Sequence, residues 1–472
     1  MATRLNRRSP SAAGVDAAGI DAFLDAIAEH ETHSLMIVRR GDVIAEGFWR
    51  PYRPDEVHLI YSISKSFTSA ALGYALTEGL LALDDHVVDL LDVADAPPTI
   101  AALTVRDLAR MTTGHVTDQG FTWKGSVVDT LLAYPPDQEP GSVWVYNQWS
   151  TWLLAALIQQ RSGVQLTEYL RPRLFEHLDI EDWAWNETGG LQHGFTGLHV
   201  QTESLAKFGH LLQRGGWLHR REVLNSDYLA EAVTKQADNS IDEHGRPRDA
   251  WPDWKLGYGY QFWMQRVGFR ADGAFGQFIL VLPAEETVVV MTGATDEMQS
   301  VLDAVWEHLL PAIDRSGSPE ADAALADRLS SLELTPVSSC SYEQIASFAS
   351  GPGNEAMGSV AHFGVAPLPG GVWELTLRFG DKVVSLLAGD REWIDGSYPG
   401  APGLEDVPVA SSAGWQDETT FVAEICALQG PHRVRVTGDL NTDTFSATWN
   451  YAPLEAATCL GHLGLPAGGR RH

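Results

Sequence analysis

One short stretch of the sequence places a nucleophile and a base at a spacing that suits acyl transfer. In Ser62-Ile63-Ser64-Lys65 the first and last residues are three apart, so on a helix they share a face and the lysine amine can reach the Ser62 hydroxyl. A serine hydroxyl attacks poorly until a base removes its proton. Lysine can be that base only where burial or neighbouring cations lower its pKa toward neutrality. A helix beginning at Ser62 would also offer backbone N–H groups to an oxyanion.

The same spacing occurs again at Ser204 and Lys207, so the spacing alone is weak evidence. The surrounding residues separate the two sites. Ser204 lies in TESLAKFGHLLQRG, which is typical of a helix with a solvated face. Ser62 instead precedes the apolar run FTSAALGYAL, which predicts a buried helix, where a lysine needs a functional reason because burying a charge is costly. We therefore expect Ser62 to be the nucleophile and Lys65 its base.

The elements around Ser62 indicate one sheet built from distant parts of the chain. Helices are expected over 16–28, through most of 67–217, and over 298–310. Stretches with strand character lie before and after the long helical region: 33–38, 43–49, 257–266, 274–282 and 287–292. Strands at both ends with helices between them predict an α/β domain, in which an antiparallel sheet is flanked by helices and carries an all-helical subdomain.

The last third of the chain has a different pattern. The stretch 314–324 (DRSGSPEADAA) is predicted to be a linker between a first domain over 1–313 and a second over 325–472. Runs in the second domain alternate between apolar and polar residues and are separated by Gly, Asp and Asn turns: 373–379, 420–427, 432–437 and 445–449. This pattern predicts an all-β domain, such as a small lipocalin-like barrel or a sandwich.

Composition restricts the partners that we expect. A formal net charge of −29 disfavours nucleic acid and anionic membrane surfaces. No apolar run is long enough to span a membrane, and no apolar segment follows the basic N-terminus as in a signal peptide. The sequence therefore predicts a cytoplasmic protein, although a chain whose export signal has been removed would look the same.

Neither metal nor organic cofactor is predicted. The three cysteines (Cys340, Cys426 and Cys459) lack the paired spacing of a zinc site and are expected to be buried free thiols. The sequence contains no P-loop and no dinucleotide-binding fingerprint.

Longer stretches resemble the serine β-lactamase and penicillin-binding-protein superfamily. YSISKSFTSAALGYALTEGLLALDDHVVDLL, followed by LTVRDLARMTTG, is most similar to its class C branch, which includes D-aminopeptidases, carboxylesterases and nylon-oligomer hydrolases. EPGSVWVYNQWSTWLLAALIQQRSG resembles the segment that carries the family's second motif. HVQTESLAKFGHLLQRGGW, LGYGYQFW and DGAFGQFILVLP extend the likeness to about residue 312. The resemblance implies a β-lactamase/DD-peptidase-like fold for two thirds of the chain.

The resemblance also implies an acyl-enzyme mechanism. Ser62 would attack a carbonyl, and Lys65 with Tyr146 would carry protons to the leaving group and then from the deacylating water. Because a phenol has an ordinary pKa near 10, Tyr146 needs a nearby ammonium to act as a base. The backbone N–H groups of Ser62 and Ala274 would form the oxyanion hole.

The second motif departs from the family's pattern. It reads Tyr146-Asn147-Gln148, with glutamine where asparagine is usual. A longer amide can still bridge Lys65 and a substrate carbonyl, so we expect Asn147 and Gln148 to lie at the substrate.

The third motif departs more strongly, because it reads Ala271-Asp272-Gly273 where relatives carry Lys-Thr-Gly or His-x-Gly. Gly273 still permits close backbone approach to a substrate, so Asp272 and Gly273 are expected to line the site. The cation that would hold a substrate carboxylate is missing. Arg270 could replace it, although neighbouring residues on a strand face opposite sides.

These features predict a serine hydrolase of a small or peptide-like uncharged ester or amide, or an acyl transferase that passes the acyl group to an amine. The alternatives are a β-lactamase, a D-Ala-D-Ala carboxypeptidase or a D-aminopeptidase. The missing cation argues against β-lactam and D-Ala-D-Ala substrates. A catalytically silent binding protein on the same fold is the alternative from another class. The retention of Ser62, Lys65 and Tyr146 argues against it.

Overall fold

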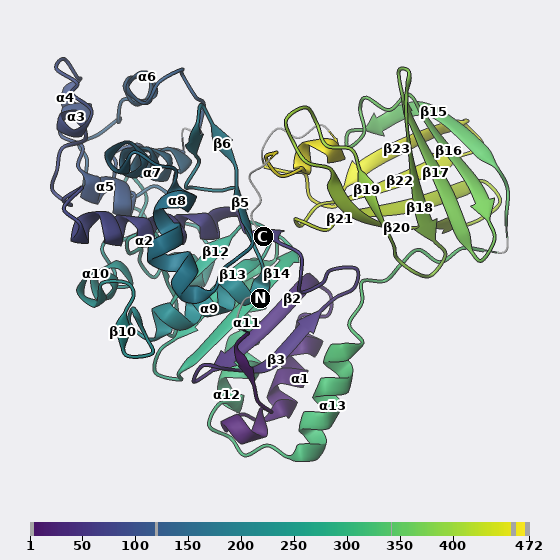
Figure 1. Ribbon diagram of the computed structural model, residues 1–472, viewed down its shortest axis with the longest axis horizontal. Coiled ribbons are helices and arrows are strands. Elements are labelled where there is room, and N and C mark those ends of the chain that lie inside the picture. The colour runs from purple at the N-terminus through teal and green to yellow at the C-terminus, as the bar shows by residue number, and fades with distance from the viewer. Residues whose placement is uncertain (1–3, 119–120, 341, 455–458, 468–472) are drawn as a thin grey trace.

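The computed structural model describes residues 4–118, 121–340, 342–454 and 459–467. Its N-terminal two thirds surround a seven-stranded sheet, and its C-terminal part forms a separate β-barrel (Figure 1). The sheet has the order β1-β3-β2-β14-β13-β12-β11. Its strands are β1 (Asn6–Arg7), β2 (Glu31–Arg39), β3 (Asp42–Phe48), β11 (Trp263–Met264), β12 (Phe269–Gly273), β13 (Gln277–Leu282) and β14 (Thr287–Ala294).

The centre of this sheet is the antiparallel pairing of β2 with β14, in which Ile37 lies opposite Val289. This pairing confirms the predicted sheet of distant segments. The predicted strand over 257–266 differs, because only Trp263 and Met264 join the sheet as β11. The residues before β11 form loop structure, in which Tyr258 and Tyr260 are buried.

Helices cover both faces of the sheet because its strand residues alternate between two cores. On β14, Val288 and Val290 belong to one core and Val289 to the other. The helices are α1 (Ala17–Ala26), α2 (Ser64–Thr77), α3 (Val87–Leu90), α4 (Pro98–Ala101), α5 (Val105–Arg110), α6 (Val127–Leu132), α7 (Gln148–Ser162), α8 (Leu166–Leu170), α9 (Thr202–Gln213), α10 (Ser226–Ala232), α11 (Met298–Ala304), α12 (Leu310–Ala312) and α13 (Pro319–Ser330). Helix α9 packs on the face of β13 and β14, whereas α1 and α11 belong to the opposite core.

Helix α2 is buried from Ser64 to Ala75, as its apolar sequence predicts. It contacts α7, α8, α10 and β12, so it lies between the sheet and the helical subdomain. The second serine–lysine pair also lies on a helix, α9, but the expectation of a solvated face is wrong at this position. Ser204 is buried, and Lys207 donates a hydrogen bond to the carbonyl oxygen of Asp179 at 3.0 Å.

The C-terminal strands form one nine-stranded sheet that closes on itself where β18 also pairs with β20, at Gly389 and Ser412. The strands are β15 (Ala346–Asn354), β16 (His362–Leu368), β17 (Val372–Phe379), β18 (Lys382–Gly389), β19 (Ile394–Tyr398), β20 (Val407–Trp415), β21 (Thr420–Ala427), β22 (Arg433–Asp439) and β23 (Thr444–Trp449). Alternate residues, such as Phe421, Ala423 and Ile425 of β21, fill the barrel. The predicted all-β barrel is confirmed.

The stretch 314–324, predicted to be a linker, instead contains the start of α13. Ser318 caps this helix by accepting a hydrogen bond from the Ala321 N–H at 3.1 Å, and a proline at the first helical position favours this start. Leu325 and Leu329 then pack into the core that contains α1. The small and charged residues thus begin an amphipathic helix that belongs to the N-terminal part.

The cysteines differ from expectation in one respect. All three are free thiols, but only Cys426 is buried, and Cys340 is exposed. Within the described residues, no helix combines the length and the apolar character that crossing a membrane requires.

Candidate active site

Ser62 lies in a single 3₁₀ turn (Tyr61–Ile63) that leads directly into α2. Its side chain is half-buried, whereas Lys65 in the first turn of α2 is buried. The Lys65 Nζ lies 3.0 Å from the Ser62 Oγ, as the spacing predicts. The same amine donates hydrogen bonds to the Gln148 Oε1 at 2.7 Å and to the carbonyl oxygen of Phe195 at 2.9 Å. These contacts aim the amine at the serine hydroxyl.

Burial changes the protonation of Lys65. It lowers the pKa of this amine to about 7, while the negative charges of Asp118 and Asp272 act in the opposite direction. Burial disfavours the charged form of an amine, because water no longer solvates it. Lys65 therefore has a substantial neutral fraction near neutral pH, and a neutral amine can accept a proton from Ser62.

Tyr146 lies just before α7, with its ring centroid 4.9 Å from the Lys65 Nζ. The ring stacks on Trp263 at 5.2 Å between centroids. Burial and the charge of Asp272 raise the pKa of Tyr146 well above its usual value, and a hydrogen bond with Ser62 opposes this only in part. Tyr146 is therefore a protonated phenol. A protonated phenol can donate a proton, and the part of Tyr146 in proton transfer stays a prediction.

Asn147 and Gln148, the two residues after Tyr146, have different roles: one caps α7 and the other binds Lys65. Asn147 caps α7, where its Oδ1 accepts a hydrogen bond from the Ser150 N–H and its Nδ2 donates to the carbonyl oxygen of Val145, both at 2.8 Å. Asn147 is buried and its side chain caps the helix, and its predicted contact with substrate stays a prediction. Gln148, the first residue of the helix, takes the predicted position beside Lys65.

Asp272 and Arg270 lie two residues apart on β12 and so share a face of the strand. The Arg270 Nε donates to the Asp272 Oδ2 at 2.9 Å, and both side chains are buried. Arg270 also donates to the carbonyl oxygen of Asp253 and lies against the Trp254 ring. Asp272 therefore belongs to a buried ion pair, and its contact with substrate stays a prediction. The Arg270 Nη2 is buried and has no hydrogen-bond partner among the described residues, and a role of Arg270 as the missing third-motif cation also stays a prediction.

Gly273 lies where β12 touches the turn that carries Ser62. A β carbon added at Gly273 would lie 2.3 Å from the Ile60 carbonyl oxygen and 3.1 Å from the Ser62 nitrogen. Only glycine fits so close to another backbone. The backbone that continues into Ala274 therefore starts beside Ser62, and the oxyanion hole of Ser62 and Ala274 stays a prediction.

Three further groups at the site could not be predicted from the sequence. Phe195 contributes a backbone carbonyl, which any residue type would supply. Asp118 contacts Gln148 from a loop, accepting a hydrogen bond from the Gln148 N–H at 3.3 Å. His432 of the barrel hydrogen-bonds to Tyr61, beside the nucleophile, at 2.6 Å. Such contacts between distant segments leave no periodic pattern in the sequence.

A sheet with helices on both faces and a serine–lysine pair at the start of a buried helix define the class of serine β-lactamases and penicillin-binding proteins. Residues 20–310 match the model of the protein family described as Beta-lactamase, and the chain belongs to this family.

A 6-aminohexanoate-dimer hydrolase from Paenarthrobacter ureafaciens is 22% identical over 320 residues, which cover 61% of this chain and 80% of that protein. A penicillin-binding-protein homologue from Caulobacter crescentus has a TM-score of 0.52 and 15% identity, covering 64% of this chain and 98% of its own. The octameric penicillin-binding-protein homologue from Pyrococcus abyssi has a TM-score of 0.50 and 15% identity, covering 91% of this chain and 97% of its own. The fold similarity thus extends beyond the family domain into the barrel.

Proposed function

We propose that this protein is a serine hydrolase that cleaves uncharged esters or amides through an acyl-enzyme on Ser62. The observation that carries the proposal is the contact of 3.0 Å between the Ser62 Oγ and the Lys65 Nζ, an amine whose pKa burial lowers to about 7. A base with a pKa near the operating pH is the most effective proton acceptor.

The first half of the reaction transfers the acyl group to the enzyme. Neutral Lys65 takes the Ser62 proton while the Ser62 Oγ bonds to the substrate carbonyl carbon. The backbone N–H groups of Ser62 and Ala274 stabilise the resulting oxyanion. The Tyr146 phenol then donates its proton to the departing oxygen or nitrogen as the scissile bond breaks, and the Lys65 ammonium returns a proton to Tyr146.

The second half releases the acyl group. Water attacks the acyl-enzyme and loses a proton to Lys65, and the Ser62–acyl bond breaks as the Ser62 Oγ is protonated again. An amine that enters in place of water would receive the acyl group, so the same intermediate supports acyl transfer. Gln148 keeps the Lys65 amine at Ser62 through both halves by its hydrogen bond of 2.7 Å.

The charges around the site support a substrate without a carboxylate beside the scissile bond. Ala271 occupies the third-motif cation position, and Arg270 is buried in its pair with Asp272. This arrangement disfavours the alternatives of β-lactam and D-Ala-D-Ala hydrolysis. The relative that hydrolyses the 6-aminohexanoate dimer supports a linear amide as one substrate class.

The proposal is tested by a panel of neutral aryl esters and anilides with the full chain. Ser62→Ala should abolish turnover, and Lys65→Ala should lower it about 10²- to 10⁴-fold, the usual contribution of proton transfer. Ser204→Ala is the matched control from the second serine–lysine pair and should keep the normal rate. If no member of the panel is hydrolysed faster by the wild type than by Ser62→Ala, the catalytically silent binding protein is favoured instead.

A further inference from the structure

The barrel reaches the nucleophile's immediate neighbour. The hydroxyl of Tyr61, the residue before Ser62, hydrogen-bonds to the Nε2 of His432 at 2.6 Å, and both side chains are buried. The Nδ1 of His432 lies 2.8 Å from the carbonyl oxygen of Tyr451. A carbonyl can only accept, so Nδ1 carries the hydrogen and Nε2 accepts from Tyr61. Burial lowers the pKa of His432 to about 4, which agrees with this neutral tautomer.

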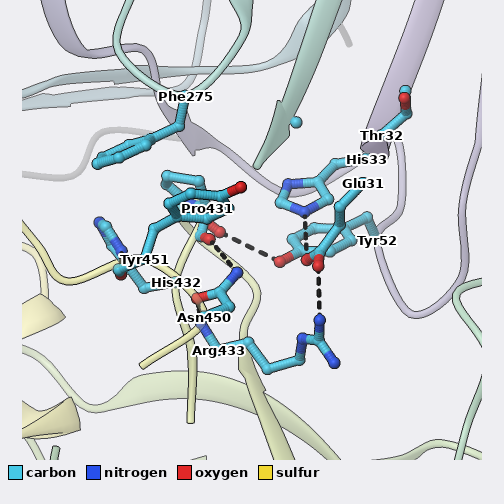
Figure 2. Close-up of polar contacts among 12 residues, drawn as sticks. Glu31, Thr32, His33, Tyr52, Phe275, Pro431, His432, Arg433, Asn450 and Tyr451 are labelled. Atoms are coloured by element: carbon cyan, nitrogen blue, oxygen red, sulfur yellow. Dashed lines mark hydrogen bonds and ion pairs between the residues drawn. The ribbon is translucent and has the colours of Figure 1, made fainter. Parts of the chain in front are cut away.

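The same histidine also contacts the turn that carries Ala274, the other proposed oxyanion donor. Phe275, the residue after Ala274, packs edge-on against His432 with 5.8 Å between ring centroids. Figure 2 shows Phe275 beside His432 and Tyr451, and the Phe275 and Tyr451 rings also pack on each other. Tyr61 and Phe275 also pack on each other, at 5.4 Å. One barrel residue is therefore in contact with the neighbours of both proposed oxyanion donors.

Both neighbours have strained backbones. The φ angles of Tyr61 and Phe275 are +46° and +66°, in the left-handed region that is unfavourable for a residue with a side chain. Such a conformation persists only where surrounding contacts hold it. The contacts available to these two side chains include His432, which hydrogen-bonds to one and packs on the other.

The segment around His432 is itself firmly docked on the N-terminal part. The Leu59 N–H donates to the Gln429 carbonyl oxygen at 2.9 Å. The Arg433 guanidinium forms an ion pair with Glu31 at 2.6 Å, visible in Figure 2. His432 thus lies between two anchors that join the barrel to strand β2 and to the chain just before Ser62.

We propose that His432 is a positioning residue that, through Tyr61 and Phe275, holds the backbone of Ser62 and Ala274 in the geometry that stabilises the oxyanion. This inference rests on the proposed function. It makes the barrel part of the active site, because the N-terminal part alone lacks the group that fixes this geometry. Removing one oxyanion donor typically lowers kcat about 10²- to 10³-fold. A donor that is displaced but still present should lower kcat less, by about ten- to a hundredfold.

The test compares Tyr61→Phe, His432→Ala, His432→Gln and the double variant Tyr61→Phe/His432→Ala, with kcat and KM measured on a small neutral ester. Tyr61→Phe and His432→Ala should each lower kcat about ten- to a hundredfold and leave KM within about twofold. The double variant should be no slower than the slower single one, because both remove one interaction. His432→Gln, whose amide oxygen can accept from Tyr61, should recover most of the rate.

Tyr52→Phe is the matched control at the same interface. Its hydroxyl donates to the carbonyl oxygen of Gly430 in the barrel at 3.2 Å and has no part in the proposed reaction, so its loss should leave kcat unchanged. Circular dichroism and the melting temperature identify any variant that does not fold. If His432→Ala does not fold, Tyr61→Phe still tests the inference, because it removes only one oxygen atom. Near-normal kcat in folded Tyr61→Phe or His432→Ala, no recovery of the rate in His432→Gln, or additive losses in the double variant would overturn the inference. If instead Ser62→Ala keeps its activity, the proposed function itself fails.

Discussion

At Lys65, burial and neighbouring charge act on one amine in opposite directions. Burial outweighs the carboxylates of Asp118 and Asp272 and leaves the pKa at about 7. The sequence predicted the residue and its need for a lowered pKa. It could not predict that distant parts of the chain bury this amine, which is what lowers its pKa.

The pH dependence of the reaction follows from this pKa. A protonated amine cannot accept the Ser62 proton, so kcat/KM for a neutral ester should rise through a pH of about 7 and level off above it. Asp118→Asn removes a negative charge that raises the pKa of Lys65, so the midpoint should move to lower pH. A rate profile that is flat between about pH 5.5 and 9 in the wild type would show that Lys65 is not the base. A midpoint that moves upward in Asp118→Asn would contradict the assigned charge effect.

At the scale of elements, the site depends on one close approach between strand β12 and the turn before α2. Gly273→Ala would place a β carbon 2.3 Å from the Ile60 carbonyl oxygen, so the two backbones must move apart. We expect at least a tenfold loss of kcat, with a smaller effect on the melting temperature than on the rate. Gly364→Ala is the matched strand control, since its added carbon would make an ordinary contact of 3.5 Å with Thr376. Full activity in Gly273→Ala would show that the proposed oxyanion geometry does not depend on this contact.

Local sequence patterns predicted the helices and strands better than the roles of the individual residues in them. The buried helix α2, the hairpin of β2 and β3, and the alternating strand β17 follow from periodicity that each segment carries by itself. The cap role of Asn147 was not predicted, because it depends on α7 beginning at Gln148, a boundary that periodicity does not fix to one residue. The role of α13 was missed because its apolar residues, Leu325 and Leu329, lie beyond the stretch that looked like a linker.

At the scale of the whole molecule, we propose that the chain divides after Ser330, so that α13 belongs to the hydrolase domain and the barrel forms the second domain. The contacts of α13 with α1 and β3 support this division. The docking of the barrel at His432 could not be predicted from the sequence, because Tyr61 and His432 are 371 residues apart. Neither segment has a sequence pattern that indicates which distant residue it contacts.

We expect the net charge and the missing third-motif cation together to determine which substrates are preferred. A carboxylate beside the scissile bond would lose hydration without gaining a cationic partner, in a protein with a net charge of −29. An ester with a free carboxylate should therefore be cleaved about ten- to a hundredfold less efficiently than its methyl-capped twin. The difference in kcat/KM between the two esters should become smaller at high salt, because salt screens the long-range repulsion between the carboxylate and the protein. A preference of tenfold or more for the ester with the free carboxylate would contradict this prediction and would indicate that a cation of the protein pairs with that carboxylate.

The central claim, that Ser62 carries the acyl group, is tested most directly by labelling the full chain with a fluorophosphonate and mapping the modified peptide by mass spectrometry. The reagent forms a phosphorus–oxygen bond with an activated serine and releases fluoride. The wild type and Ser204→Ala should carry one adduct, on Ser62, and Ser62→Ala should carry none. An adduct on Ser204, or labelling of Ser62→Ala at the wild-type rate, would contradict the assignment of Ser62 as the nucleophile.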